Sequence, residues 1–329
     1  MIASLIDFLP RRTHHALWCL LLCACGVQAR TFDMNSDVIG EIALTTTVKE
    51  DAIIYIARAN DMGYREMRLA NPKVDAWMPG DNTEVVVPSL FVLPDAPREG
   101  IVINVPEMRL FYYPPLKGKQ TPQVVTYPIS IGREQWVTPK GVTKVVGKTK
   151  DPWWYPPQSI RREHAADGDP LPKAVPPGPD NPLGQFALRL GINGYLIHGT
   201  DKPFGIGMRV THGCIRMYPE DIEAAFDSIP VGTAVRIVNE PYKVGISGGK
   251  LYLEVHPSLD EDQSHFHDVF TLVVNLIIRK TKGRAVELDW NALKETVAKK
   301  DGIPVIIGTS APQSAALAPS RSYASALKP

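Results

Sequence analysis

The stretch Gln123-Val-Val-Thr-Tyr-Pro-Ile-Ser-Ile131 is rich in β-branched and aromatic residues, which is typical of a β-strand. Other short β-rich segments, punctuated by Gly or Pro, lie on both sides of it along the chain: 101–105, 109–113, 143–146, 186–190 and 234–238. Many short strands separated by turn residues are typical of a sandwich or a barrel. The sequence therefore predicts a mainly β domain in this region.

The composition bounds the class of protein. A chain of 329 residues exceeds the usual size of one domain, so about two folded units with appendages are expected. Hydrophobic residues make up 44% and charged residues 22%, which is enough material for a core and excludes disorder throughout. The 36 Lys and Arg against 35 Asp and Glu leave a formal net charge of +1 without a long basic tract, so we expect no nucleic-acid partner.

Residues 1–29 have the pattern of an export signal. Arg11 and Arg12 precede the apolar run 16–27, and Val27-Gln-Ala29 is a small-residue cleavage pattern. The run is shorter than the roughly 20 apolar residues of a spanning helix, and no later stretch of the sequence reaches that length. We therefore expect an exported protein without a transmembrane helix, cut after Ala29.

The cysteines are unevenly distributed. Cys19, Cys23 and Cys25 all lie in the leader, so cleavage after Ala29 leaves Cys214 alone and excludes an internal disulfide. In an alternative interpretation the leader ends in a lipoprotein box, with Cys25 as a lipidated anchor. An unpaired thiol is a liability in an oxidising compartment, so Cys214 is a candidate for chemistry.

Cys214 lies in the segment Arg209-Val-Thr-His-Gly-Cys-Ile-Arg-Met217. If this segment is extended, His212 and Cys214 project to the same side. Gly213 lets a substrate approach the backbone closely. Backbone N–H groups around Gly213 and Cys214 could then stabilise negative charge that develops on a carbonyl oxygen.

A second element, Gly194-Tyr-Leu-Ile-His-Gly-Thr200, reads as a short buried strand that delivers His198 at its end. An imidazole that accepts the proton of a thiol makes the sulfur a good nucleophile. Such a base needs a third group to fix its tautomer, and the carbonyl of Gly199 could supply it. The residues thus favour a Cys nucleophile with His198 or His212 as its base.

Other interpretations of this set stay open. His198, His212 and Cys214 could be zinc ligands, although their separations match no common zinc signature. The histidines could be satisfied core residues, or Cys214 an inert buried thiol. We expect neither a metal nor a cofactor.

The pairing of Ile197-His-Gly-Thr200 with Thr211-His-Gly-Cys-Ile-Arg216 resembles the signature of the L,D-transpeptidase (YkuD-type) catalytic domain. The likeness covers residues 98–239, including Asn181-Pro-Leu-Gly184 and Met217-Tyr-Pro-Glu-Asp-Ile222. It implies a YkuD-like β-sandwich or barrel and a periplasmic enzyme of the ErfK/YbiS-like group that acts on the cell wall.

The resemblance also implies roles for the site residues. Cys214 would be the nucleophile, His198 its base, and Gly199 the residue that orients His198 through its carbonyl. His212 would help to hold the acyl donor or the oxyanion. The donor would be a tetrapeptide stem of peptidoglycan, which forms a thioester with Cys214 and loses its terminal D-Ala.

The acceptor separates three hypotheses. An amine acceptor gives transpeptidation, which either crosslinks diamino acids or joins the C-terminal Lys of an outer-membrane lipoprotein to the wall. Water gives an L,D-carboxypeptidase or amidase. In a third hypothesis the protein only binds peptidoglycan and Cys214 is vestigial.

Arg216 and Thr211 are candidates for substrate binding. The planar fork of Arg216 could pair with a substrate carboxylate. Alternatively, Arg216 could form a salt bridge with Glu220 or Asp221, on a helix expected to begin near Pro219.

Trp153 and Trp154 are two more candidates for substrate binding. They begin a stretch, 152–182, that holds nine of the 30 prolines, so we expect an ordered loop without regular elements. Loops of this length are often lids over a site. The two rings could wall a substrate groove or pack against the sheet.

The flanking segments predict two smaller units. Residues 45–93 read as a strand, two helices and a strand, similar to the glycan-binding LysM module, although Lys49-Glu-Asp51 replaces its Gly-Asp-Thr turn. Residues 240–308 resemble the helical C-terminal extension of periplasmic members, with a strand over 250–255, helices over 268–280 and 290–299 that cover the sheet, and a further element at 303–307. Residues 309–329 are rich in Ala, Ser and Pro and are expected to be disordered.

Overall fold

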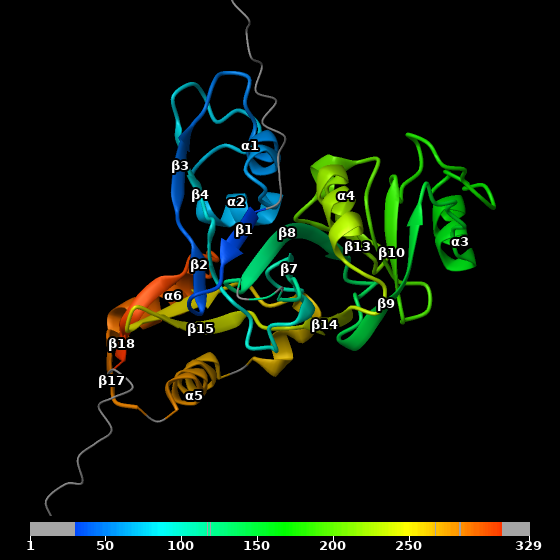
Figure 1. The fold of residues 1–329 in the computed structure, drawn as a ribbon. Helices are drawn as coiled ribbons and strands as arrows, with labels where there is room; N and C mark the ends of the chain where they lie inside the picture. Colours follow the sequence, from blue (N-terminus) through cyan, green and yellow to red (C-terminus); the bar gives the residue numbers. More distant parts are fainter. Residues whose placement is uncertain (1–29, 117, 119, 267, 283, 311–329) are drawn as a thin grey trace, which may run out of the picture.

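The structure is a computed structural model that describes residues 30–310 except 117, 119, 267 and 283. The predicted leader and the predicted lipidation site at Cys25 lie outside the described residues. Three units follow one another: an N-terminal module (residues 38–93), a central barrel and a C-terminal unit (residues 240–310) (Figure 1). The N-terminal module and the C-terminal unit lie at the same end of the barrel, and α3 (Gln158–Ala166) lies at the opposite end.

The central sheet has ten strands and closes on itself. Its order is β1-β8-β13-β11-β10-β9-β14-β6-β7, and β7 also pairs with β8, while β12 attaches to β8. These strands are β1 (Arg30–Asp33), β6 (Gly100–Asn104), β7 (Arg109–Tyr113), β8 (Gln123–Gly132), β9 (Gly141–Lys150), β10 (Phe186–Leu190), β11 (Leu196–His198), β12 (Arg209–Thr211), β13 (Ile215–Met217) and β14 (Ala234–Val238). The prediction of a mainly β fold is confirmed, and every predicted strand of the region is present.

The strands β6 and β7 are buried on both faces, because alternate side chains enter two different cores. Ile101 and Leu110 pack inside the barrel, with the helix α4 (Pro219–Ser228) against the same core. Val102 and Phe111 point to the other face and pack with the N-terminal module. The module is therefore joined to the barrel by a shared apolar core.

The N-terminal module contains the predicted order of a strand, two helices and a strand. Its elements are β2 (Val38–Gly40), β3 (Ala43–Thr46), α1 (Ile53–Ala59), α2 (Tyr64–Ala70), β4 (Glu84–Val87) and β5 (Leu90–Val92). β3 pairs with β4, and β2 pairs with β5. Kinship with LysM stays a prediction.

The C-terminal unit is not only helical. β15 (Tyr242–Ser247), β16 (Lys250–Val255), β18 (Val305–Ser310) and β17 (Val286–Leu288) form a sheet in that order. The helices α5 (Val269–Thr281) and α6 (Trp290–Lys299) share a core with this sheet. The expectation that these helices cover the main sheet is therefore wrong, and the tail boundary predicted at 309 is too early, since β18 reaches Ser310.

Two details explain these differences. Gly248 and Gly249 both have positive φ, and Ser247 pairs with Lys250, so a two-residue turn folds β15 and β16 into a hairpin. The proline-rich stretch contains the helix α3, which is not among the predicted elements. The helix forms there because its nine residues lack Pro and include good helix formers. The turns η1 (Pro203–Gly205) and η2 (Asp260–His265) are 3₁₀ helices.

Among the described residues, none of the helices is long and apolar enough to span a membrane.

Candidate active site

Two short parallel strands bring the predicted site residues together. β11 pairs with β13 so that His198 lies opposite Arg216, and Cys214 precedes β13 by one residue. His198, His212, Cys214 and Arg216 all line one pocket of about 450 Å³. The histidines and the thiol therefore share a cavity, as the sequence predicted.

His198 is held in one orientation by its own neighbour. Its Nδ1 lies 2.7 Å from the carbonyl oxygen of Gly199, and since a carbonyl only accepts, Nδ1 carries the proton and Nε2 is the basic nitrogen. His198 is 4% exposed. Burial, followed by the positive charge of Arg216, lowers its pKa to about 3, so the ring is neutral at neutral pH.

Gly199 allows α4 to pack closely over the histidine strand. A Cβ at Gly199 would lie 3.1 Å from Cγ2 of Ile222 on α4 and 3.4 Å from the carbonyl oxygen of Leu183. The contact with Ile222 is tighter than ordinary packing, so a side chain at Gly199 would make Ile222 shift by a few tenths of an ångström. The Gly199 carbonyl thus orients the His198 ring, and the lack of a side chain on Gly199 leaves room for α4.

Cys214 is a half-buried free thiol. Its Sγ lies 3.7 Å from the carbonyl oxygen of Gly194. Burial raises the pKa of Cys214, while a backbone contact at Leu196 and the charge of Arg216 act in the opposite direction. The resting site therefore holds a thiol and a neutral imidazole.

The loop before Cys214 is bent, so the expectation of an extended segment is wrong. Gly213 has φ of +99°, and a Cβ there would lie 2.9 Å from Cε1 of Tyr195. Gly213 is thus needed for the bend and for the Tyr195 ring, not for the approach of a substrate to its Cα. The glycine conformation is one that L-residues rarely adopt.

Thr211 holds this loop from inside. Its hydroxyl accepts a hydrogen bond from the Gly213 N–H at 3.1 Å and donates one to the Cys214 carbonyl at 2.6 Å. The Thr138 hydroxyl donates to the Gly213 carbonyl at 2.9 Å. With Thr211 only 2% exposed, its hydroxyl positions the Cys214 backbone and is already engaged.

His212 contacts residues that the sequence analysis did not predict. Nη2 of Arg133 lies 2.9 Å from Nε2 of His212, and since a guanidinium only donates, Nδ1 of His212 carries the proton. Arg133 also pairs with Glu163 of α3, which accepts from Trp136 Nε1 at 3.1 Å. Burial, followed by Arg133, lowers the pKa of His212 to about 4.

Arg216 does not form either of the salt bridges considered above. Glu220 accepts two hydrogen bonds of 2.9 Å from Arg58, and Asp221 faces Asp61. Within the part of the chain that the structure describes, Nε of Arg216 has no hydrogen-bond partner. Its guanidinium lines the pocket with the charge of Asp201 acting on it through space.

Aromatic rings wall the other side of the pocket. Trp153 is 52% exposed and stacks on Tyr155 with ring centroids 6.4 Å apart. Trp154 is half-buried and forms a β-bridge with Val175. Both tryptophans line the pocket, so the alternative that Trp153 packs away against the sheet is wrong.

The chain is similar to known proteins over most of its length. The family model of the L,D-transpeptidase catalytic domain (YkuD) matches residues 98–237. Over 255 residues the chain is 41% identical to "Probable L,D-transpeptidase YbiS" of Escherichia coli K12, covering 76% of this chain and 81% of that protein. The chain belongs to the L,D-transpeptidase family.

Two more relatives support the same assignment. "Probable L,D-transpeptidase ErfK/SrfK" of Salmonella typhimurium is 42% identical over 254 residues, covering 76% of this chain and 80% of that protein. "Probable L,D-transpeptidase YcfS" of Escherichia coli K12 is 40% identical over 255 residues, with 76% and 78% covered. The resemblance that the two histidine motifs carried is confirmed, and the chain is a transpeptidase enzyme.

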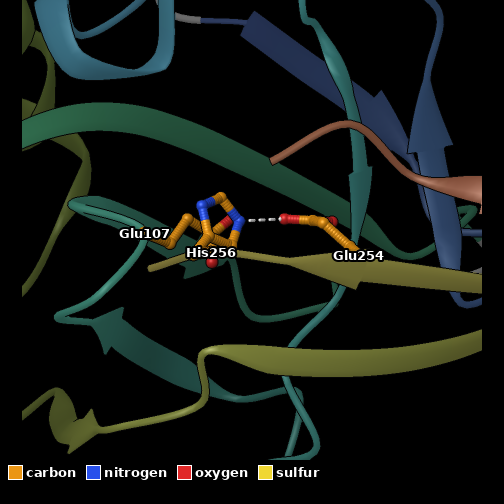
Figure 2. A group of neighbouring side chains, drawn as sticks. All are labelled: Glu107, Glu254 and His256. Carbon is orange, nitrogen blue, oxygen red and sulfur yellow. Dashed lines mark hydrogen bonds and ion pairs between the residues drawn. The ribbon is translucent and has the colours of Figure 1, made fainter. Parts of the chain in front are cut away.

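A second cluster of titratable groups lies away from the transpeptidase pocket. Glu107, Glu254 and His256 place three potential ligand atoms within 4.8 Å of one another, and Nε2 of His256 lies 2.6 Å from Glu254 (Figure 2). Nζ of Lys243 lies 2.8 Å from an oxygen of each glutamate, so the cation of this cluster is an ammonium group. The predicted zinc alternative of His198, His212 and Cys214 forms no such group in the described part of the chain.

Proposed function

We propose that the protein is an exported peptidoglycan L,D-transpeptidase that works through a thioester on Cys214. The observation that carries this proposal is the hydrogen bond from Nδ1 of His198 to the Gly199 carbonyl, which leaves Nε2 as the basic nitrogen of a ring that lines the same pocket as the thiol. A base with a fixed tautomer beside a Cys nucleophile is the arrangement needed for acyl transfer.

The chemistry follows from the resting charges. Nε2 of His198 takes the Sγ proton as the sulfur attacks the amide carbonyl between the L centre of the diamino acid and D-Ala. The Gly213 N–H is engaged with Thr211, which leaves the Cys214 N–H to stabilise the oxyanion. The protonated His198 then gives its proton to the leaving D-Ala amine, and a thioester remains.

The pocket fits a peptide donor that carries a carboxylate. Arg216 offers a guanidinium whose Nε lacks a partner in the described chain, and Trp153 and Trp154 offer apolar faces. His212, held by Arg133, would contact the donor or the oxyanion. We further propose that the N-terminal module binds glycan and that the leader exports the enzyme to the periplasm with cleavage after Ala29.

An amine acceptor fits the family assignment better than water does. The amine attacks the thioester, His198 accepts its proton, and Cys214 leaves as the thiol. The acceptor would be a diamino acid of a second stem or the C-terminal Lys of an outer-membrane lipoprotein. Water in place of the amine would make the protein an L,D-carboxypeptidase.

The test uses a purified tetrapeptide stem with and without an added amine acceptor, and mass spectrometry of the products. A transpeptidase forms the amine adduct, whereas a hydrolase releases the tripeptide whether or not the amine is present. Cys214→Ala should abolish both products while binding to purified sacculi persists. Turnover by Cys214→Ala equal to that of the wild type would exclude both enzyme functions and leave only a wall-binding role.

A further inference from the structure

The backbone nitrogen of Arg30 lies beside a buried carboxyl group. Its N–H donates to Oδ2 of Asp61 at 3.1 Å. The position of this nitrogen is fixed, since Arg30 begins β1 and pairs with Thr126 of β8. Asp61 is 2% exposed and lies between α1 and α2 of the N-terminal module, so the hydrogen bond crosses from the barrel sheet to the module.

Asp61 is one half of a buried carboxyl pair. Asp221, in the first turn of α4, is 1% exposed, and burial, followed by the charge of Asp61, raises the pKa of Asp221. Burial is the largest cause that raises the pKa of Asp61, to about 7. In the described chain, Oδ1 of Asp61 and both carboxyl oxygens of Asp221 have no hydrogen-bond partner, so a shared proton is needed to keep the two groups together.

The nearby guanidinium groups are engaged elsewhere. Arg109, fully buried, donates to both oxygens of Glu66 at 2.8 and 2.9 Å. Arg58 donates to both oxygens of Glu220. The Arg30 side chain acts on Asp61 only through space. The pair at Asp61 and Asp221 is thus a built anionic site without a cation at hydrogen-bond distance among the described residues.

We infer that this site receives the ammonium group that appears when the export signal is removed after Ala29. Water adds across the Ala29–Arg30 peptide bond, Ala29 leaves as a carboxylate, and the Arg30 nitrogen becomes an amine that takes up a proton. The 3.1 Å hydrogen bond then becomes an ion pair between an ammonium and the Asp61 carboxylate. This inference rests on the processing step of the proposed function.

Processing adds one positive charge at hydrogen-bond distance from Asp61. The Arg109 guanidinium is already paired with Glu66, and the Arg30 guanidinium acts on Asp61 only through space. The new ammonium would therefore be the charged partner in direct contact with the Asp61 carboxylate, and a buried charge is stable only when it is paired.

This ion pair also connects to the active site. α4 carries Asp221 at its start and Ile222 next to it, and Ile222 is the residue that packs over Gly199. Gly199 in turn holds the ring of His198. The mature N-terminus therefore locks the helix that covers the catalytic histidine to the N-terminal module.

The experiment measures how fast the N-terminal amine is acylated by an activated ester at neutral pH. The protein is released from a cleavable fusion so that it begins at Arg30, and the modified N-terminal peptide is quantified by mass spectrometry. A free α-amine has a pKa of about 8, and a carboxylate partner raises it by about 1–3 units. Acylation of folded protein should therefore be at least about tenfold slower than in the same chain unfolded in urea.

Two variants make the result specific. A protein that begins at Ala29 carries its amine one residue away and should be acylated at the rate of the unfolded chain. Asp61→Asn keeps the size of the side chain and removes the carboxylate, so it should restore fast acylation, with circular dichroism as the check that it is folded. Equal rates in the Arg30 form, the Ala29 form and Asp61→Asn would overturn the inference.

The outcome is independent of catalysis. The rate at which the amine is acylated does not depend on turnover. A negative result would therefore not affect the proposed role of Cys214, and an inactive enzyme could still have a protected amine. N-terminal sequencing of protein exported by cells tests the processing step separately. A mature chain that begins at a residue other than Arg30 would also overturn the inference.

Discussion

Lys243 is the cation of the buried cluster at the junction of the three units, and its replacement by Met tests how they are held together. Its Nζ lies 2.8 Å from Glu107 at the barrel, 2.8 Å from Glu254 of β16 and 2.7 Å from the carbonyl of Val92 in the N-terminal module. Burial alone would lower the pKa of Lys243, but the two glutamates raise it. Lys243→Met keeps the length of the side chain and leaves two buried carboxylates without their cation.

The expected loss is large. Removal of one partner from a buried ion pair costs about 3–5 kcal/mol, and each kcal/mol lowers the melting temperature by about 2–4 °C for a protein of this size. The melting temperature of Lys243→Met should therefore fall by roughly 6–20 °C. Lys250→Met is the matched control, because Lys250 is an exposed lysine of β16 and its loss should change stability by less than about 0.5 kcal/mol.

The pH dependence distinguishes charge from packing. Burial already raises the pKa of Glu107 in the wild type. Without Lys243 the pKa of both glutamates rises in the folded state, which then binds more protons than the unfolded chain, so the variant recovers stability as the pH falls from about 7 to about 5. Urea unfolding at both pH values measures this. A loss below about 1 kcal/mol that is the same at both pH values would refute the reasoning.

Four other outcomes are expected. A carbapenem should acylate Cys214, as the family resemblance implies, and a mass shift on the peptide that contains Cys214 checks this. Gly213→Ala should lower stability by about 1–3 kcal/mol and acylation with it, because of the positive φ and the Tyr195 ring; thermal unfolding and carbapenem labelling measure the two losses. Arg216→Met should raise KM for the tetrapeptide donor at least about tenfold if a carboxylate pairs with it, with a smaller rise in Arg216→Lys. His198→Gln should lose less stability in acid than the wild type, because the folded wild-type ring stays neutral down to about pH 3 while the unfolded ring binds a proton below its ordinary pKa. Urea unfolding from about pH 7 to about pH 4 measures this, and an equal dependence of stability on pH in the two proteins would contradict it.

Local signals in the sequence predicted the barrel and the core of the site. Gln123–Ile131 and its neighbours formed strands because β-branched runs between turn residues suit a sheet. The helix expected near Pro219 begins there, since Pro fits the first turn of a helix. The hydrogen bond of His198 to Gly199 joins adjacent residues, so it could be anticipated from the sequence alone.

The remaining site contacts join residues far apart in the chain. Arg133 and Glu163 meet at His212 only because the end of β8 and the unpredicted α3 lie against the same loop. Tyr195 over Gly213 likewise depends on the bend of the loop. The Gly248-Gly249 turn is different, because two adjacent glycines between β-rich segments are a hairpin signal in the sequence itself, so the C-terminal sheet could have been predicted.

The charge of Arg216 has opposite effects on Cys214 and His198. Its charge lowers the pKa of Cys214, which favours the thiolate, and also lowers the pKa of His198, which disfavours the imidazolium. In a resting ion pair, the charge of Arg216 would stabilise the thiolate of Cys214 and destabilise the imidazolium of His198. Burial would destabilise both charged forms. If Arg216 binds a carboxylate of the donor, as proposed, this carboxylate would offset the charge of Arg216 and allow His198 to hold the proton for the leaving amine. The base would then be effective only when the donor is present.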